Sequence, residues 1–351
     1  MAERLLLNPL AGPLAPAAPP SGPVVFHRSL PGYAVTPLVE APAAAAALGV
    51  RRVLVKDESS RLGLPSFKVL GASWATYRAL CGRLGLDAEP VVALDTLRER
   101  LLDGRAVGLV CATDGNHGHA VARMARTLGL EATVLVPGTM LEARRAAIAG
   151  EGARVEVVDG TYDDAVQQAA ALADRDRLVI QDTAWPGYET VPTWVIEGYA
   201  TIGAEIDVRP DVVAVQIGVG SFAAAMVRRF AGARIVGVEP VSAACALASA
   251  EAGGLADVPG PHDSAMAGLN CGRPSPVAWP LLSRGIEAFA AVTDQRADEA
   301  VAMLASDGIT AGESGAAGLA GLLAFHSVLA LPADATVLVV NTEGDTAALR
   351  P

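Results

Sequence analysis

Lys68 is the residue of this sequence that is best placed for chemistry at an amine. It lies in the segment 66–71 (Ser-Phe-Lys-Val-Leu-Gly), between Phe67 and an apolar run, at the expected first turn of a helix. Lysine occurs only at positions 56 and 68, because nearly all other positive charge is carried by arginine. Apolar neighbours and the positive end of a helix dipole predict a lowered pKa for Lys68. A free amine can form a Schiff base, whereas the alternative is a surface lysine whose amine extends into solvent.

The segment 113–118 (Thr-Asp-Gly-Asn-His-Gly) holds a second set of polar groups. It follows an expected strand that ends at Ala112, and it opens an expected helix. Its glycines permit close approach of the backbone to a ligand, and the helix dipole favours a negative group there. Asn116 can donate a hydrogen bond to a phenolate-type oxygen, and Asp114 can accept a proton. An ordinary capping turn, with aspartate or asparagine at the N-cap, is the alternative.

Two further turns also follow expected strands. Gly218, Val219, Gly220 and Ser221 lie between a strand and a helix, an arrangement that binds phosphate on backbone amides. The turn lacks the lysine of a P-loop and the third glycine of a dinucleotide fingerprint, so it predicts a single phosphate group. In the last such turn of the chain, the hydroxyl of Thr342 can face a ring nitrogen. For each turn taken alone, an ordinary glycine or polar turn is the alternative.

These residues need a framework that brings their turns together. We expect strands at 53–56, 107–112, 132–136, 154–158, 178–181, 212–217, 235–239 and 336–341. Between them we expect helices, at 119–130, 141–149, 163–174, 192–206, 222–232 and 298–307. This alternation predicts parallel sheets with helices on both faces. Ligands bind such sheets where the carboxyl ends of strands meet helix N-termini, so the turns are predicted to form one site.

Composition limits the classes of protein that the chain can represent. Its 351 residues carry a net charge of −11 without a basic stripe, which argues against binding to nucleic acid. The four cysteines are scattered, so we expect buried thiols in a reducing cytoplasm and no metal site. The Ala/Pro-rich stretch up to residue 23 predicts a flexible or wrapping arm and not a signal peptide. The uncharged segment 314–334 predicts a buried helix, and a membrane span is the alternative.

Longer motifs resemble one enzyme family. They are Phe-His-Arg-Ser-Leu-Pro-Gly-Tyr at 26–33, Val-Lys-Asp-Glu-Ser at 55–59, Gln-Asp-Thr-Ala-Trp at 181–185, Met-Ala-Gly-Leu-Asn-Cys-Gly at 266–272 and Thr-Glu-Gly-Asp-Thr at 342–346. Together they are similar to the 2,3-diaminopropionate ammonia-lyases, which are pyridoxal-phosphate enzymes of fold type II. The lysine segment and the Gly-Asn-His-Gly segment are shared with many fold-type II enzymes. The segment around Asp182 and an aspartate at position 114 are more specific to the ammonia-lyases, and the resemblance covers nearly the whole chain from residue 26 onward.

The resemblance implies an α/β protein with the tryptophan synthase β-like fold of these enzymes. It implies two three-layer α/β/α domains with mostly parallel sheets. Residues 1–75 and 200–351 are expected to form the large domain, which binds pyridoxal phosphate, and residues 76–199 the small domain. A cytoplasmic homodimer that acts on a small amino acid is also implied, without nucleic acid, membrane or metal.

The resemblance also assigns residues to pyridoxal 5'-phosphate. Lys68 would hold the cofactor as a Schiff base and, once released, move protons, while Phe67 packs beside the cofactor. Asn116 would hydrogen-bond the ring hydroxyl, and the amides of Gly218, Val219, Gly220 and Ser221 the phosphate. Thr342 would face the ring nitrogen. A neutral hydroxyl there leaves that nitrogen largely unprotonated, which suits β-elimination better than transamination.

Asp114 and Asp182 are the acids that the resemblance implies for the reaction. Asp114 stands where many relatives carry a small hydroxyl residue, and Asp182 comes from a different segment. They are expected to remove the Cα proton from opposite enantiomers, or to bind the second ammonium group of 2,3-diaminopropionate. β-Elimination of ammonia then gives pyruvate. The alternatives are a serine or threonine dehydratase, a β-replacement enzyme for another 3-substituted alanine, and a non-catalytic protein that binds the cofactor or a partner.

Five other side chains have two interpretations each. Trp185, Tyr188 and Trp194 line the substrate pocket or, as is more usual for large aromatics after a strand, belong to the core. His117 is expected to be a turn residue of the cofactor loop and not the principal base. Glu313 contacts the cofactor ring or caps the helix that follows it.

Overall fold

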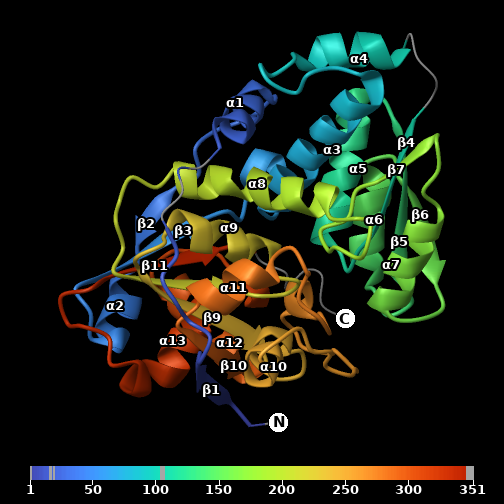
Figure 1. Cartoon of the computed structure of the whole chain (residues 1–351). Coiled ribbons are helices and arrows are strands. Elements are labelled where there is room, and N and C mark those ends of the chain that lie inside the picture. Colours follow the sequence, from blue (N-terminus) through green and yellow to red (C-terminus); the bar gives the residue numbers. More distant parts are fainter. Residues whose placement is uncertain (1, 16–17, 19, 103–106, 345–351) are drawn as a thin grey trace.

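The computed structural model describes residues 2–15, 18, 20–102 and 107–344, and it contains two separate β-sheets (Figure 1). The larger sheet has seven strands in the order β1-β10-β9-β8-β11-β3-β2. Their bounds are Arg4–Leu7 (β1), Leu38–Glu40 (β2), Arg52–Asp57 (β3), Val212–Gln216 (β8), Arg234–Pro240 (β9), Ala288–Val292 (β10) and Thr336–Asn341 (β11). The inner strands pair in parallel, whereas β1 and β2 pair antiparallel at the two edges.

The smaller sheet has four parallel strands in the order β6-β5-β4-β7. They span Gly108–Ala112 (β4), Glu131–Pro137 (β5), Arg154–Val158 (β6) and Arg177–Val179 (β7). All four lie within residues 76–199, the range expected for the small domain. The expected boundaries themselves fall inside two helices, α3 (Lys68–Leu84) and α8 (Thr190–Ala204), so the division into domains stays a prediction.

Helices cover both faces of each sheet. In the large sheet, Val212 and Ala214 pack on the side of α13, whereas Val213 and Val215 pack on the side of α9. The small sheet alternates in the same way between α5 and α7. The remaining helices named so far span Asn116–Leu128 (α5), Tyr162–Ala171 (α7), Ser221–Arg229 (α9) and Glu313–Leu329 (α13). Both units are therefore three-layer α/β/α structures, as expected for a fold-type II enzyme.

The other helices complete these layers and the connections. They span Ser21–Ser29 (α1), Pro42–Leu48 (α2), Leu94–Leu102 (α4), Glu142–Gly150 (α6), Cys245–Ala252 (α10), Trp279–Gly285 (α11) and Asp294–Ser306 (α12). Two short 3-10 helices span Arg61–Gly63 (η1) and Ala267–Leu269 (η2).

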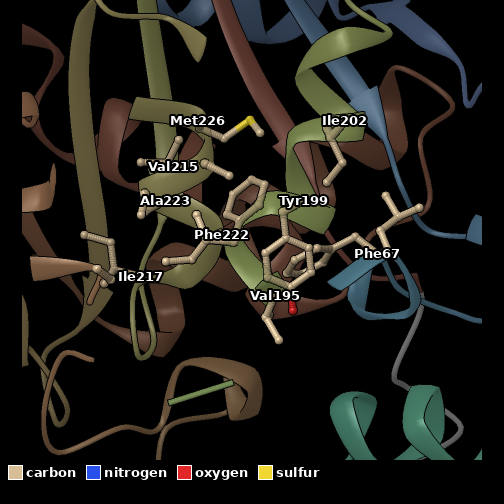
Figure 2. Packing of buried hydrophobic residues seen from close by; sticks show 14 of the residues in the cluster. Phe67, Val195, Tyr199, Ile202, Val215, Ile217, Phe222, Ala223 and Met226 are labelled. Atoms are coloured by element: carbon tan, nitrogen blue, oxygen red, sulfur yellow. The ribbon is translucent and has the colours of Figure 1, made fainter. Parts of the chain in front are cut away.

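Helices α3 and α8 pack against each other between the two sheets (Figure 1). Their contact is close because of two glycines: a Cβ on Gly198 would lie 2.5 Å from the carbonyl oxygen of Leu70, and one on Gly71 would meet the ring of Tyr199. Phe67 precedes α3, and its ring packs against Tyr199 and Phe222 at centroid distances of 4.7 and 5.0 Å (Figure 2). This buried cluster fixes the start of α3, where Lys68 lies.

A network of buried ion pairs involves residues that shortly precede Lys68 in the sequence. Arg61, which is fully buried, donates hydrogen bonds to Glu58 and Glu205. Lys56 pairs with the same Glu205 at 2.6 Å. A buried arginine needs such charged partners, because it does not lose its proton in proteins. The network thus joins β3, η1 and the end of α8.

All eight expected strands are confirmed to within about two residues, but three others were missed. β1 and β2 are short edge strands, and β10 is rich in alanine, which carries little strand signal. The stretch up to residue 23 was expected to be a flexible or wrapping arm. Its start forms β1, which pairs with β10 at the edge of the large sheet and so fits the wrapping alternative, and its last residues belong to α1, which begins at Ser21. Residues 16, 17 and 19 of that stretch, and residues 345 and 346 of the last motif, lie outside the described part of the chain.

The uncharged segment at 314–334 is largely helix α13, which is buried over most of its length and leads into β11. Within the described residues, no helix combines the length and the hydropathy needed to cross a bilayer.

Candidate active site

One cavity lies where the carboxyl ends of strands from both sheets face each other. It encloses about 800 Å³ of empty space, its open mouth included. The turns after β4, β8 and β11 all reach it, as expected for parallel strands. Every residue that we assigned to the cofactor or to catalysis lines this cavity: Phe67, Lys68, Asp114, Asn116, Asp182, Gly218, Val219, Gly220, Ser221 and Thr342.

Lys68 is the first residue of α3, and its Nζ lies 2.7 Å from Oδ2 of Asp182. Burial alone would lower the pKa of Lys68, but the Asp182 carboxylate outweighs burial and raises this pKa above its ordinary value. The expected lowering of the Lys68 pKa is therefore wrong for the cofactor-free protein. The neighbours in sequence are apolar, as expected, but the partner in space is an acid.

Asp182 is a buried carboxylate that stays ionised. Burial would raise its pKa, but the Lys68 ammonium lowers the pKa of Asp182 to about 2. The backbone of the same residue is fixed by Ser221, whose hydroxyl donates to the Asp182 carbonyl at 2.8 Å. The acid from the small sheet is thus tied to the glycine turn of the large sheet.

His117 lies beside this pair as a neutral side chain. Burial lowers its pKa, and its Nε2 lies 2.8 Å from the carbonyl oxygen of Ile180. Because a carbonyl only accepts, Nε2 carries the proton, and Nδ1, 3.9 Å from Asp182, is unprotonated. His117 lines the cavity as the second residue of α5, and its place in a cofactor loop stays a prediction.

Asp114 differs from Asp182 in charge state. Burial raises the pKa of Asp114 to about 7, although Arg144 opposes this effect. The Arg144 guanidinium also donates to the backbone carbonyl of Asp114 at 3.1 Å. Of these two acids, Asp182 is therefore ionised near neutral pH, whereas Asp114 is close to half protonated.

The glycine turn suits a phosphate group. Among the described residues, the backbone N–H groups of Gly218, Val219, Gly220 and Ser221 have no hydrogen-bond acceptor. Gly220 is the N-cap of α9 and Ser221 its first residue, so their amides lie at the helix end whose dipole favours an anion. A Cβ on Gly218 would lie 2.9 Å from the Gly268 carbonyl oxygen, so position 218 has no room for a side chain. These features fit the phosphate of pyridoxal phosphate.

Replacing Gly220 with alanine is expected to weaken cofactor binding by at least about tenfold, or ~1.4 kcal/mol. Gly220 has a φ of +93°, and a Cβ there would lie 2.5 Å from a methyl group of Leu282. The turn must move to relieve both strains, and its amides then no longer point at one anion. Fluorescence titration of the cofactor-free protein with pyridoxal phosphate measures the change. Gly82→Ala is the control, since a Cβ at Gly82 meets nothing within 4 Å, and equal affinities for both variants would contradict the assignment.

Several lining residues were not anticipated from the sequence. Glu343 accepts a hydrogen bond from Nδ2 of Asn116 at 2.7 Å and fixes its amide. Gln216 donates to the hydroxyl of Thr342 at 2.7 Å. Because that hydroxyl already accepts, its own proton is available for a ring nitrogen. Among the described residues, that proton has one acceptor, the Ser314 carbonyl oxygen at the long distance of 3.5 Å. Glu343 lies inside a motif that was recognised, whereas Gln216 and Arg144 carried no signal in the sequence.

The three aromatic residues considered for the pocket do not line this cavity. Trp185 and Tyr188 stack on each other at 4.1 Å, and the Tyr188 hydroxyl donates to the backbone of Val179. Glu313 lies in the first turn of α13 and is not among the lining residues either. The described residues contain no cluster of three or more His, Cys, Asp or Glu that could hold a metal ion.

Comparison with known proteins identifies the class of this fold and site. The family model described as "Pyridoxal-phosphate dependent enzyme" matches residues 30–343. The chain therefore belongs to the pyridoxal-phosphate-dependent enzymes, and its two sheets and lysine-bearing cavity are those of fold type II.

The relatives narrow this class. The chain is 36% identical to diaminopropionate ammonia-lyase of Escherichia coli K12 over 92% of this chain and 87% of the relative. The crystal structure of the Escherichia coli enzyme with D-serine matches with a TM-score of 0.91 and 34% identity, over 99% of this chain and 95% of that one. A second structure of that enzyme, with an aminoacrylate-PLP azomethine reaction intermediate, matches over the same shares with a TM-score of 0.89 and 34% identity. Within its class, the chain belongs to the diaminopropionate ammonia-lyase family of lyases.

Proposed function

We propose that this protein eliminates ammonia from D- and L-2,3-diaminopropionate and gives pyruvate and a second ammonia. The observation that carries the proposal is the pair of acids, Asp114 and Asp182, that line one cavity together with Lys68. A substrate with two ammonium groups needs more negative charge than a hydroxy amino acid does. A plain dehydratase has no use for a second buried carboxylate, which disfavours that alternative.

The lining residues fit the cofactor as follows. Lys68 would hold it covalently, and the free amides of 218–221 would bind its phosphate. The Thr342 hydroxyl would donate to the ring nitrogen, Asn116 would hydrogen-bond the ring hydroxyl, and Phe67 would pack beside the ring. When bound, pyridoxal phosphate supplies an electron sink for the carbanion left at Cα.

Asp114 and Asp182 have two tasks in this reaction: proton removal from Cα and binding of the second ammonium group. One of them takes the Cα proton, and the β-nitrogen then leaves with its bonding electrons as ammonia. Because the acids belong to different segments, each suits a proton on a different side of Cα. The acid that does not act as base pairs with the second ammonium group of the substrate. Arg144 keeps the pKa of Asp114 from rising further and so keeps this acid usable as a base near neutral pH.

Because Asp114 and Asp182 have different pKa values, the activities toward the two enantiomers should depend differently on pH. A base acts only when deprotonated, so the enantiomer that depends on Asp114 should lose activity as the pH falls through about 7. The other enantiomer depends on Asp182, whose pKa of about 2 keeps it ionised throughout. The ratio of kcat/KM for the two enantiomers should therefore change about fivefold between pH 7 and pH 6, and about fiftyfold between pH 7 and pH 5.

This ratio is the quantity to measure, because titration of the substrate is the same for both enantiomers and cancels. A ratio that is constant from pH 5 to pH 9, measured by pyruvate release, would contradict the assignment of a different base to each enantiomer. It would leave the overall reaction intact.

Substrate identity is tested by comparing pyruvate or ketoacid release from D- and L-2,3-diaminopropionate, serine and threonine. We expect the highest kcat/KM on a diaminopropionate enantiomer. A higher value on serine or threonine would favour the dehydratase alternative. Transfer of an added thiol to the β-carbon would favour β-replacement on another 3-substituted alanine, and no turnover of any of them would favour a non-catalytic cofactor-binding protein.

We also propose that the protein is a cytoplasmic homodimer whose residues 76–199 form the smaller domain. The support is the family, the free cysteines and the containment of the small sheet in that range. Light scattering of the purified protein should give twice the chain mass of 35.7 kDa. A monomer mass at micromolar concentration would overturn the proposed assembly.

A further inference from the structure

The hydroxyl of Tyr199 is a buried polar group without a hydrogen-bond partner among the described residues. Tyr199 lies in α8, its side chain is fully buried, and its ring packs on Phe67 beside Val195 (Figure 2). Buried hydroxyls in proteins are nearly always paired, and an unpaired one calls for an explanation. The proposed reaction assigns no part to this residue.

Helix packing brings the Tyr199 phenol to the start of α3. A Cβ on Gly71 would lie 2.6 Å from Cζ of Tyr199, the atom that bears the hydroxyl. Gly71 follows Lys68 by three residues on the same helix, so the two lie on adjacent positions of one face. The hydroxyl end of the tyrosine therefore reaches the helical turn that begins with Lys68.

The two side chains also interact electrostatically. Burial and the Asp182 carboxylate have the largest effects on the pKa of Lys68, and Tyr199 in its ionised form has the next, which shows that the two groups are close enough to influence each other's titration. In return, the Lys68 ammonium lowers the pKa of Tyr199, although burial raises it overall. No hydrogen bond joins the two side chains in this structure, and the Lys68 amine donates to Asp182 at 2.7 Å.

We propose that Tyr199 is a second hydrogen-bonding partner of Lys68, which receives the amine when it leaves Asp182. The inference rests on the proposed function, in which Asp182 turns to the substrate while Lys68 is released. Rotation about the side-chain torsions of lysine would exchange the carboxylate for the phenol without moving either helix. Tyr199 is thus a positioning residue: it orients the Lys68 amine and does not act as an acid or a base in the reaction.

The phenol suits this task because it is neutral. Burial keeps Tyr199 protonated, so it can accept a hydrogen bond from an ammonium group or donate one to a free amine. The interaction with the charged ammonium is the stronger of the two. Removing the hydroxyl should therefore make Lys68 less basic wherever Asp182 does not hold it.

The chain has only two lysines, which makes a direct test possible. Protein labelled with ¹³C at the lysine ε-carbon gives two signals, and the cofactor-free Asp182→Asn variant leaves Tyr199 as the partner of Lys68. We expect Asp182→Asn/Tyr199→Phe to contain about tenfold more uncharged Lys68 at a given pH than Asp182→Asn alone. Equal titration midpoints in the two proteins would overturn the proposal.

Controls separate this role from a structural one. Tyr77→Phe in the same background removes a hydroxyl that is bonded to Ala88 and Val92, and it should leave the Lys68 midpoint unchanged. Lys56, buried in its pair with Glu205, is the internal reference. Tyr199→Phe should not lower the melting temperature, because its hydroxyl has no bond to lose; a lower melting temperature with an unchanged Lys68 midpoint would mean that the role is structural.

Two features keep the outcome interpretable. If Asp182→Asn does not fold, Asp182→Ser serves as the background, since both remove the carboxylate. The titration needs neither cofactor nor substrate, so its failure is distinguishable from failure of the proposed function, which is judged by pyruvate release.

Discussion

Replacing Lys68 with alanine is expected to remove the visible absorbance of the lysine-bound cofactor and to lower kcat by at least about 10⁴-fold. Lys68 supplies the only lysine amine of the cavity. The other lysine, Lys56, is fully buried and bonded to Glu205 and the backbone of Thr36, so it cannot take over. The absorbance and single-turnover pyruvate release of the reconstituted variant measure both losses.

The same substitution leaves Asp182 without its partner. Its pKa should then rise from about 2, because only the Lys68 ammonium offsets the effect of burial to this extent. The alanine variant is therefore expected to be less stable, by up to about 3 kcal/mol. Lys68→Arg is the matched control: it keeps a cation beside Asp182 and so most of the stability, but it cannot form a Schiff base. Substantial activity in the arginine variant would refute the covalent role.

Lys68 also illustrates what the sequence could predict. The apolar flanks and the helix start were visible locally, and both are confirmed. The direction of the pKa shift was not, because it depends on Asp182, 114 residues away along the chain. A lowered pKa was the natural inference from local residues, and a single distant carboxylate reverses it.

The strands of the sheets also differ in how well the local sequence predicts them. Strands with continuous β-branched runs, such as β8 and β11, were predictable because their pattern is local and strong. β10 (Ala-Phe-Ala-Ala-Val) is fully buried, yet its alanines favour a helix as much as a strand. Only its pairing with β9 and β1 makes it a strand, and pairing is a property of the folded chain.

In the site, motif residues were predictable and their supports were not. Asn116 and Thr342 stood out by their places in turns, whereas the Glu343 and Gln216 side chains that orient them were recognised only in three dimensions. Gln216 is the last residue of β8 and looks like an ordinary strand residue in the sequence. The side-chain amide of Gln216 is buried and donates to backbone carbonyl groups and to the Thr342 hydroxyl. These bonds fix the orientation of the Thr342 hydroxyl, the group predicted to face the cofactor ring.

Replacing each acid of the cavity is expected to impair opposite enantiomers. Asp114→Asn should lower kcat/KM for one enantiomer of 2,3-diaminopropionate by about 10²- to 10⁴-fold, and Asp182→Asn should do so for the other. Asparagine keeps the shape of the side chain but cannot take a proton. The measurement is pyruvate release from each pure enantiomer by each variant.

The enantiomer ratio matters more than either rate alone, because Asp182 has two functions. Asp182→Asn also removes the carboxylate that holds Lys68, and this loss should slow both enantiomers through the released lysine. The common loss cancels in the ratio, so a reciprocal change between the two variants isolates the role as base. Asp95→Asn, which removes an exposed acid of α4 outside the cavity lining, should leave the ratio unchanged. If both active-site variants shift the ratio in the same direction, the two acids do not serve opposite faces, and one base must then act on both enantiomers.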